Sequence, residues 1–295
     1  MSEKEFKSIP VAGGNYHYGR WAGNADQLLL VHGITASHMA WPRFVREYGA
    51  EQTLVAPDLR GRGKNAGLPA PFGFAQHIED ILRLLDAEQI DQAVWVGHSL
   101  GAYIGLDFAY QHADRIRALV LVDGGVALPL PADRSPEEVI KGLLGPALAR
   151  LEKTFASREA YHEFWQAHPA FQDPEAWNED VLAYVDYDLT GEPPAMKSVV
   201  NPTAIEVDSL GPMAPSMVNR IDEVTLPTLL LTAPRGLLNQ EKPLLPATAV
   251  AEIAARNDHV SVQEITDTNH YSILTGSGAS QVASAVKDFL FRLNQ

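Results

Sequence analysis

The stretch AVWVGHSLG, at residues 93–101, decides the fold of this chain. Its first four residues are apolar, which is typical of a strand buried on both faces in a parallel sheet. Residues 97–101 then read G-x-S-x-G, and residues 100–112 have the pattern of a buried helix. A sharp strand-to-helix turn holds a serine where a base can activate its hydroxyl, and the two glycines leave room for that turn. The stretch predicts Ser99 as a nucleophile; the alternative is a serine that merely caps the helix.

Strands and helices alternate on both sides of this stretch. Apolar runs typical of buried strands lie at residues 28–31, 53–56, 93–96, 118–122 and 228–231, with a weaker alternating run at 260–265. Residues 76–88 and 278–293 are amphipathic with near-helical spacing. Alternation of this kind predicts an α/β fold with right-handed crossovers.

Residues 126–220 interrupt the alternation. They have no buried-strand pattern and hold eight aromatic residues, with helical patches at 136–155 and 158–167. We interpret residues 126–220 as an inserted helical cap, or lid, and residues 1–125 and 221–295 as the core. The aromatic residues either form the core of the cap or contact a substrate; they are Phe155, Tyr161, Phe164, Trp165, Phe171, Trp177, Tyr184 and Tyr187.

Composition excludes several classes of function. The chain has 295 residues, no cysteine and a formal net charge of −14. Without cysteine there is no disulfide, no thiolate metal site and no cysteine nucleophile. The negative charge disfavours nucleic acid, and no apolar run approaches the ~20 residues of a membrane helix. The first residues lack the apolar region of a signal peptide. We therefore expect a cytoplasmic monomer or homodimer that binds neither nucleic acid nor membranes.

Together these motifs resemble the α/β-hydrolase family over nearly the whole chain. The matching segments are HGIT (32–35), APDLRGRG (56–63), VGHSLG (96–101), LVLVDGG (119–125), TLLLTAPRG (228–236) and TNHYSIL (268–274). The resemblance implies a mostly parallel eight-stranded sheet flanked by helices, with a cap inserted after the sixth strand. It also implies the order nucleophile, acid, histidine, and no cofactor.

The resemblance places the catalytic base at His270, in the loop before the last helix. An oxyanion hole needs two donors aimed at one point, and we expect these to be the amides of Ile34 and Leu100. His32 is interpreted as a structural residue that packs its loop. No H-E-x-x-H motif or histidine cluster is present, so we expect no metal site.

The acid departs from the commonest family pattern, in which it follows the seventh strand. Here that loop, residues 232–241, contains no aspartate but offers Asn239 and Glu241. The sixth strand ends in Asp123, at the carboxyl edge where α/β active sites lie. We favour Asp123 as the acid, with Glu241 as the second candidate and Asn239, or no acid, as the third. Alternatively, Asp123 is only a turn residue before two glycines.

These residues predict a serine hydrolase, resembling a carboxylesterase, that cleaves an ester through an acyl-enzyme with a Ser-His-Asp triad. The aromatic cap favours a small apolar or aromatic substrate, and the candidates for binding it are Trp41, His98, Trp165 and Tyr184. A C–C bond hydrolase or a lactonase on the same fold is the alternative. A ligand-binding homologue without catalysis is a third possibility, although such a protein would be expected to have lost the serine or the histidine.

Two other patterns are interpreted as structural. Residues 61–66 match G-x-G-x-x-A, but the glycines and prolines that follow do not allow the helix that a dinucleotide site needs, so we expect a turn anchored by Asp58. The histidines without a motif around them are expected on the surface or in loops: His17, His38, His77, His112, His162, His168 and His259.

Overall fold

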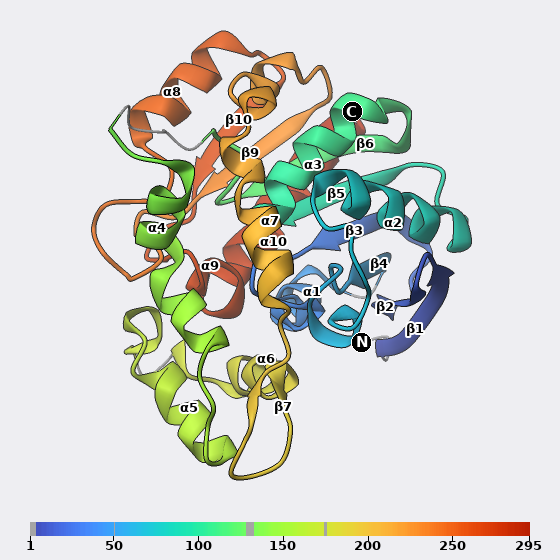
Figure 1. The fold of residues 1–295 in the computed structure, drawn as a ribbon. Helices are drawn as coiled ribbons and strands as arrows, with labels where there is room; N and C mark the ends of the chain where they lie inside the picture. Colours follow the sequence, from blue (N-terminus) through green and yellow to red (C-terminus); the bar gives the residue numbers. More distant parts are fainter. Residues whose placement is uncertain (1–3, 50, 128–132, 174–175) are drawn as a thin grey trace.

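The computed structural model describes residues 4–49, 51–127, 133–173 and 176–295. Its centre is an eight-stranded sheet with the order β1-β2-β4-β3-β5-β6-β9-β10, which confirms the predicted fold class (Figure 1). The strands are β1 (Lys4–Val11), β2 (Gly14–Trp21), β3 (Ala25–Val31), β4 (Gln52–Pro57), β5 (Ala93–His98), β6 (Ile116–Val122), β9 (Thr228–Thr232) and β10 (Val260–Glu264). From β4 to β10 all neighbours are parallel, whereas β1 pairs antiparallel with β2, and β2 with β4.

Helices cover both faces of the sheet. Alternate residues of a strand point to opposite faces, and Leu29 and Val31 pack in a different apolar cluster from Leu28 and Leu30. One face is covered by α2 (Phe74–Ala87), α3 (Leu100–Gln111) and α8 (Ala247–Arg256). The other is covered by α1 (Pro42–Tyr48), α9 (Ser272–Thr275) and α10 (Gly278–Leu293). Burial on both faces explains why the parallel strands have continuous apolar runs.

The chain between β6 and β9 is called here the β6–β9 segment, and its described residues contribute no strand to the main sheet. It contains α4 (Pro136–Leu151), α5 (Arg158–Gln166), α6 (Glu179–Asp188) and α7 (Pro202–Ser209). A small antiparallel pair, β7 (Leu189–Thr190) and β8 (Lys197–Ser198), was not predicted. In Figure 1, α5 and α6 lie in the lower part of the view, away from α2 and α3. Most of the aromatic residues of the segment form an apolar cluster of their own, with Phe155, Tyr161, Trp165, Phe171 and Tyr184 buried in it.

Two histidines expected on the surface or in loops are fully buried. His38 Nδ1 lies 2.9 Å from Asp58 Oδ1, and His77 Nε2 lies 2.9 Å from Asp208 Oδ2. The prediction was wrong for these two because each imidazole has a carboxylate partner that is distant in the sequence. Asp58 also accepts a hydrogen bond from the amide of Lys64, at 2.9 Å, as expected of the anchor of this turn.

No helix within the described residues combines the length and the apolarity that crossing a membrane would require.

Candidate active site

Ser99 occupies a tight turn between β5 and α3. Its backbone has φ 53° and ψ −118°, so the residue lies in the left-handed region that L-residues seldom adopt. The turn is held by the Ser99 amide, which donates to the carbonyl of Val122 at 2.9 Å. A Cβ on Gly97 would overlap the carbonyl of Gly101, and one on Gly101 would overlap the carbonyl of Val31. Close packing of backbone on backbone therefore explains why G-x-S-x-G follows this strand.

His270 and Asp123 form a hydrogen-bonded pair. Imidazole Nδ1 lies 2.6 Å from Asp123 Oδ2, although the two residues are 147 positions apart. His270 lies between β10 and α9, and Asp123 directly follows β6. The carboxylate is fully buried, and its other oxygen accepts from the amide of Ala233 at 3.2 Å. An Nδ1–H that donates to the carboxylate leaves Nε2 of the same ring able to accept a proton.

The other two candidates for the acid lie elsewhere. Glu241 is exposed to solvent. Asn239 uses its side-chain oxygen to accept from Asn269 Nδ2 at 3.2 Å. Within the described residues, Asp123 is the candidate whose carboxylate contacts the imidazole of His270.

The expected oxyanion residues lie beside Ser99. Ile34 and Leu100 line one cavity together with Ser99 and His270. Leu100 is the first residue of α3, and the first amides of a helix have no acceptor within it, which favours negative charge there.

His32 supports the loop that carries Ile34. Its Nε2 accepts from the amide of Leu59 at 2.9 Å, which leaves Nδ1 to donate to the carbonyl of Gly33 at 2.7 Å. Burial lowers the pKa of His32 to about 3, so the ring is neutral at physiological pH. His32 is thus a neutral support between two backbone segments, as interpreted from the sequence.

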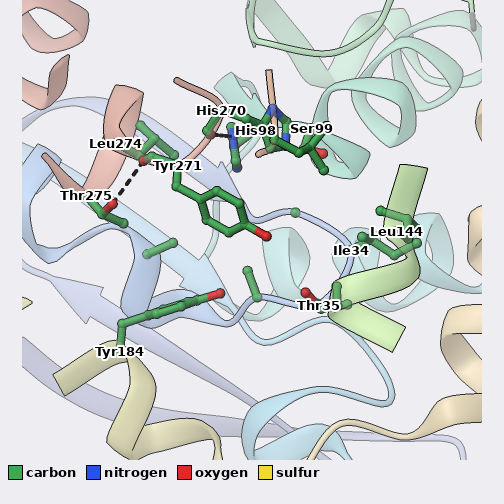
Figure 2. A pocket seen from close by; sticks show the side chains of 15 residues that line it. Ile34, Thr35, His98, Ser99, Leu144, Tyr184, His270, Tyr271, Leu274 and Thr275 are labelled. Atoms are coloured by element: carbon green, nitrogen blue, oxygen red, sulfur yellow. Dashed lines mark hydrogen bonds between the residues drawn. The ribbon is translucent and has the colours of Figure 1, made fainter. Parts of the chain in front are cut away.

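Two adjoining cavities meet at Ser99. Both are partly open, and the space outside atoms, open solvent included, is about 540 Å³ in the first and 500 Å³ in the second. The residues that line both are Ile34, Ser99, Leu144, Leu237 and His270. The first cavity extends to Tyr184 and Tyr271 (Figure 2), and the second extends to Tyr103 and Met213.

The substrate-binding candidates divide into two pairs. His98 and Tyr184 line the first cavity. His98 Nε2 also lies 2.9 Å from the carbonyl of His270, and burial lowers the pKa of His98 well below its ordinary value.

Trp41 and Trp165 do not line either cavity. Trp41 is fully buried against Phe44 in the cluster under α1, and Trp165 is buried among the aromatic residues of the β6–β9 segment. Their large rings are used in core packing, which differs from the expected substrate contact.

Most of the other lining residues were not recognised in the sequence, and Leu144, Leu237 and Tyr271 are examples. Leu144 comes from α4 and Leu237 from the loop after β9, and neither has a local motif. Tyr271 directly follows His270, and this adjacency to the expected base was the available signal. Burial raises the pKa of Tyr271, so its hydroxyl stays uncharged.

Among the described residues, no group of three or more His, Asp and Glu side chains is placed to hold a metal ion.

Comparisons with known proteins agree with the fold. A family model described as the alpha/beta hydrolase fold matches residues 26–277. The chain is 28% identical over 270 residues to a 3-hydroxybutyrate-oligomer hydrolase of Cupriavidus necator, covering 86% of each chain. It is 33% identical over 106 residues, 36% of its length, to an uncharacterized protein of Mycobacterium tuberculosis, and the match covers only 31% of that relative.

A solved structure similar to this chain is that of E-2-(acetamidomethylene)succinate hydrolase. Its TM-score is 0.78 at 19% identity, with 97% of this chain and 99% of the other covered. At this identity the similarity is one of fold.

Proposed function

The chain belongs to the alpha/beta hydrolase fold family, and from that premise we propose that it is a serine hydrolase that cleaves carboxylic esters. The observation that carries the proposal is the buried pair of His270 and Asp123, with Nδ1 and Oδ2 2.6 Å apart. His270 lines the same cavities as Ser99, which lies on the left-handed turn after β5.

The reaction follows from these positions. The hydroxyl oxygen of Ser99 attacks the ester carbonyl carbon while Nε2 of His270 takes its proton, and Asp123 stabilises the imidazolium. The carbonyl oxygen becomes an oxyanion held by the amides of Ile34 and Leu100. Collapse breaks the bond to the alcohol oxygen, which receives the proton from His270. A water molecule then adds to the acyl-enzyme in the same way, releases the acid and restores the Ser99 hydroxyl.

Two cavities that meet at the nucleophile suit an ester, because one can hold the acyl group and the other the alcohol. The lining of the second is mainly apolar, with Ile140, Leu143 and Met213 among its residues. The first adds the hydroxyls of Tyr184 and Tyr271, whose pKa values are raised by burial, so they are uncharged donors. We expect a neutral, apolar or aromatic substrate. In this proposal, residues 126–220 act as the cap that covers the site, since α4 contributes Leu144 to both cavities.

The test combines a covalent probe with a substrate panel. A fluorophosphonate should label the wild-type protein and leave Ser99→Ala unlabelled. Equal labelling of both would contradict the assignment of Ser99 as the nucleophile. The panel contains p-nitrophenyl esters of increasing chain length, 3-hydroxybutyrate oligomers, lactones and diketones. We expect ester cleavage. Cleavage of lactones or diketones without ester cleavage would assign the alternative reaction to the same site.

A further inference from the structure

Two buried arginines hold the loop that carries the proposed oxyanion donor. Arg62 Nε donates to the carbonyl of Ile34 at 2.8 Å, and Arg150 Nη2 to the carbonyl of Thr35 at 3.4 Å. Both side chains are almost completely buried. Consecutive carbonyls of this loop therefore each accept a hydrogen bond from a guanidinium group.

The contact from Arg62 determines how the Ile34 residue is oriented. The Ile34 amide shares a planar peptide unit with the carbonyl of Gly33, which accepts from His32 at 2.7 Å. The next unit contains the Ile34 carbonyl, which Arg62 binds. Since both units that flank the Ile34 Cα are anchored, its backbone torsions are fixed and its amide direction is defined.

Each arginine is paired with an aspartate of the β6–β9 segment. Arg62 Nη1 pairs with Asp208 of α7, whose carboxylate also binds His77 and accepts from the amide of Gly73 at 2.8 Å. The core segments around residues 34, 62, 73 and 77 are therefore connected to α7 through one buried carboxylate.

The second pair lies within the β6–β9 segment and reaches the core through the carbonyl of Thr35. Arg150, at the end of α4, pairs with Asp188 at the end of α6, and its Nη1 lies 2.7 Å from the hydroxyl of Tyr161. Ser198 donates to the other oxygen of Asp188 at 2.9 Å. The guanidinium lies 4.8 Å from the ring centre of Trp165, a distance at which a cation and an aromatic face attract.

Stability does not by itself account for these pairs. A buried ion pair is often no more stabilising than well-packed apolar residues of the same volume, because both charges lose their hydration. What an apolar pair could not do is donate hydrogen bonds to the carbonyls of Ile34 and Thr35.

We propose that Arg62, held by Asp208, is a positioning residue for the oxyanion hole, and that Arg150 with Asp188 supports the adjacent peptide. The hole is then fully formed only while the β6–β9 segment is docked on the core. This inference rests on the proposed function, in which the Ile34 amide binds the oxyanion.

The sequence supplies a matched control two residues away. Arg60 forms an equally buried pair with Asp80, with two contacts of 2.8 Å, but donates to the carbonyl of Pro69 instead of the oxyanion loop. The test therefore compares Arg62→Met/Asp208→Leu with Arg60→Met/Asp80→Leu. Each double variant removes one complete buried ion pair together with the other contacts of its aspartate, which are His77 and the Gly73 amide for Asp208 and Gln76 for Asp80.

Three measurements are made on both variants: the rate of fluorophosphonate labelling at Ser99, kcat and KM for a p-nitrophenyl ester, and hydrogen exchange of a peptide covering residues 33–36. We expect the Arg62/Asp208 variant to lose about tenfold or more in labelling rate and kcat, with KM within about twofold, since small misplacements in an active site have effects of this size. Exchange at residues 33–36 should be faster. The control should match the wild type in all three.

Equal losses in both variants, or none in the Arg62/Asp208 variant, would overturn the proposal. If that variant does not fold, Arg62→Lys replaces it. Its single ammonium keeps a charge for Asp208 but lacks the fork that binds Asp208 and the Ile34 carbonyl together, so the same losses are expected. If wild-type Ser99 is not labelled at all, the proposed function fails, and hydrogen exchange still decides the positioning role. Unchanged exchange in the variant would then refute it.

Discussion

Replacing Asp123 by asparagine tests the proposed triad with little disturbance of the fold. Asp123 has a φ of 46°, in the left-handed region that asparagine adopts more readily than most residues. In the wild-type protein the amide of Ala233 lies 3.2 Å from Asp123 Oδ1. Asparagine has the same shape as aspartate, and its side-chain oxygen can still accept this hydrogen bond. In that orientation the NH₂ group takes the place of Oδ2 and faces Nδ1 of His270.

The consequence for His270 follows from the 2.6 Å contact. Facing an NH₂ donor, Nδ1 must become an acceptor, so the proton of the neutral ring moves to Nε2. The ring can then no longer take the proton of Ser99. The corresponding change in a serine protease triad lowers kcat about 10⁴-fold, which equals about 5.4 kcal/mol of transition-state stabilisation. We expect a loss of this size.

The assay measures kcat on the ester that the panel identifies, with thermal unfolding as the control for folding. Glu241→Gln and Asn239→Gly serve as comparisons, because Glu241 is exposed and Asn239 bonds to Asn269. Both should keep kcat within about twofold of wild type. If Asp123→Asn keeps a tenth of the wild-type kcat, or if Glu241→Gln loses more, the assignment of the acid is wrong.

Two further predictions concern stability. Gly101→Ala would place a Cβ against the backbone carbonyl of Val31 and should lower the free energy of unfolding by roughly 1–3 kcal/mol or more. Gly142→Ala on α4, where a Cβ meets nothing within 4 Å, should be neutral or raise it by up to about 1 kcal/mol. Urea unfolding measures both. Stability should also fall on acidification below pH 6.5, by about 1.4 kcal/mol per pH unit for His32 alone, because the unfolded imidazole binds a proton there while the native ring, with a pKa of about 3, does not. The lowered pKa of His98 should reduce stability on acidification in the same way. A free energy of unfolding that is equal at pH 7.5 and 5.5 would contradict the lowered pKa of both histidines.

The parallel part of the fold was predictable because its signals are local. β5 and β6 are buried on both faces, and their apolar runs are continuous in the sequence. The predicted helix at residues 278–293 matches α10. β1 was missed because it is the edge strand and its side chains are mostly exposed. β2 lies between β1 and β4, but its buried aromatic residues are interrupted by polar residues and glycine, so it has no continuous apolar run either.

The residues of the candidate site also divide into those with a local sequence signal and those without one. Ser99, its glycines and His270 could be placed because each has a motif close to it in the chain. Leu144 and the partners of Arg62 could not, since their roles depend on how the β6–β9 segment packs on the core. His77 shows the difficulty most clearly: only the approach of Asp208, 131 residues later, makes its burial favourable.

The proposed acid, Asp123, shows how a family pattern could change without a change of geometry. β6 and β9 are parallel neighbours, with Val122 opposite Leu231, so residues that follow the two strands emerge side by side. The amide of Asp123 donates to the carbonyl of Leu231 at 2.7 Å, and the amide of Ala233 donates to the Asp123 carboxylate. The loop after β9 thus contacts the Asp123 carboxylate through a backbone amide, although it does not supply the proposed acid itself. A carboxylate on either strand could reach the same imidazole nitrogen, because His270 follows β10, the next parallel strand. The order of nucleophile, acid and histidine along the chain is the same in both arrangements, and the aspartate in the sequence decides which one is used.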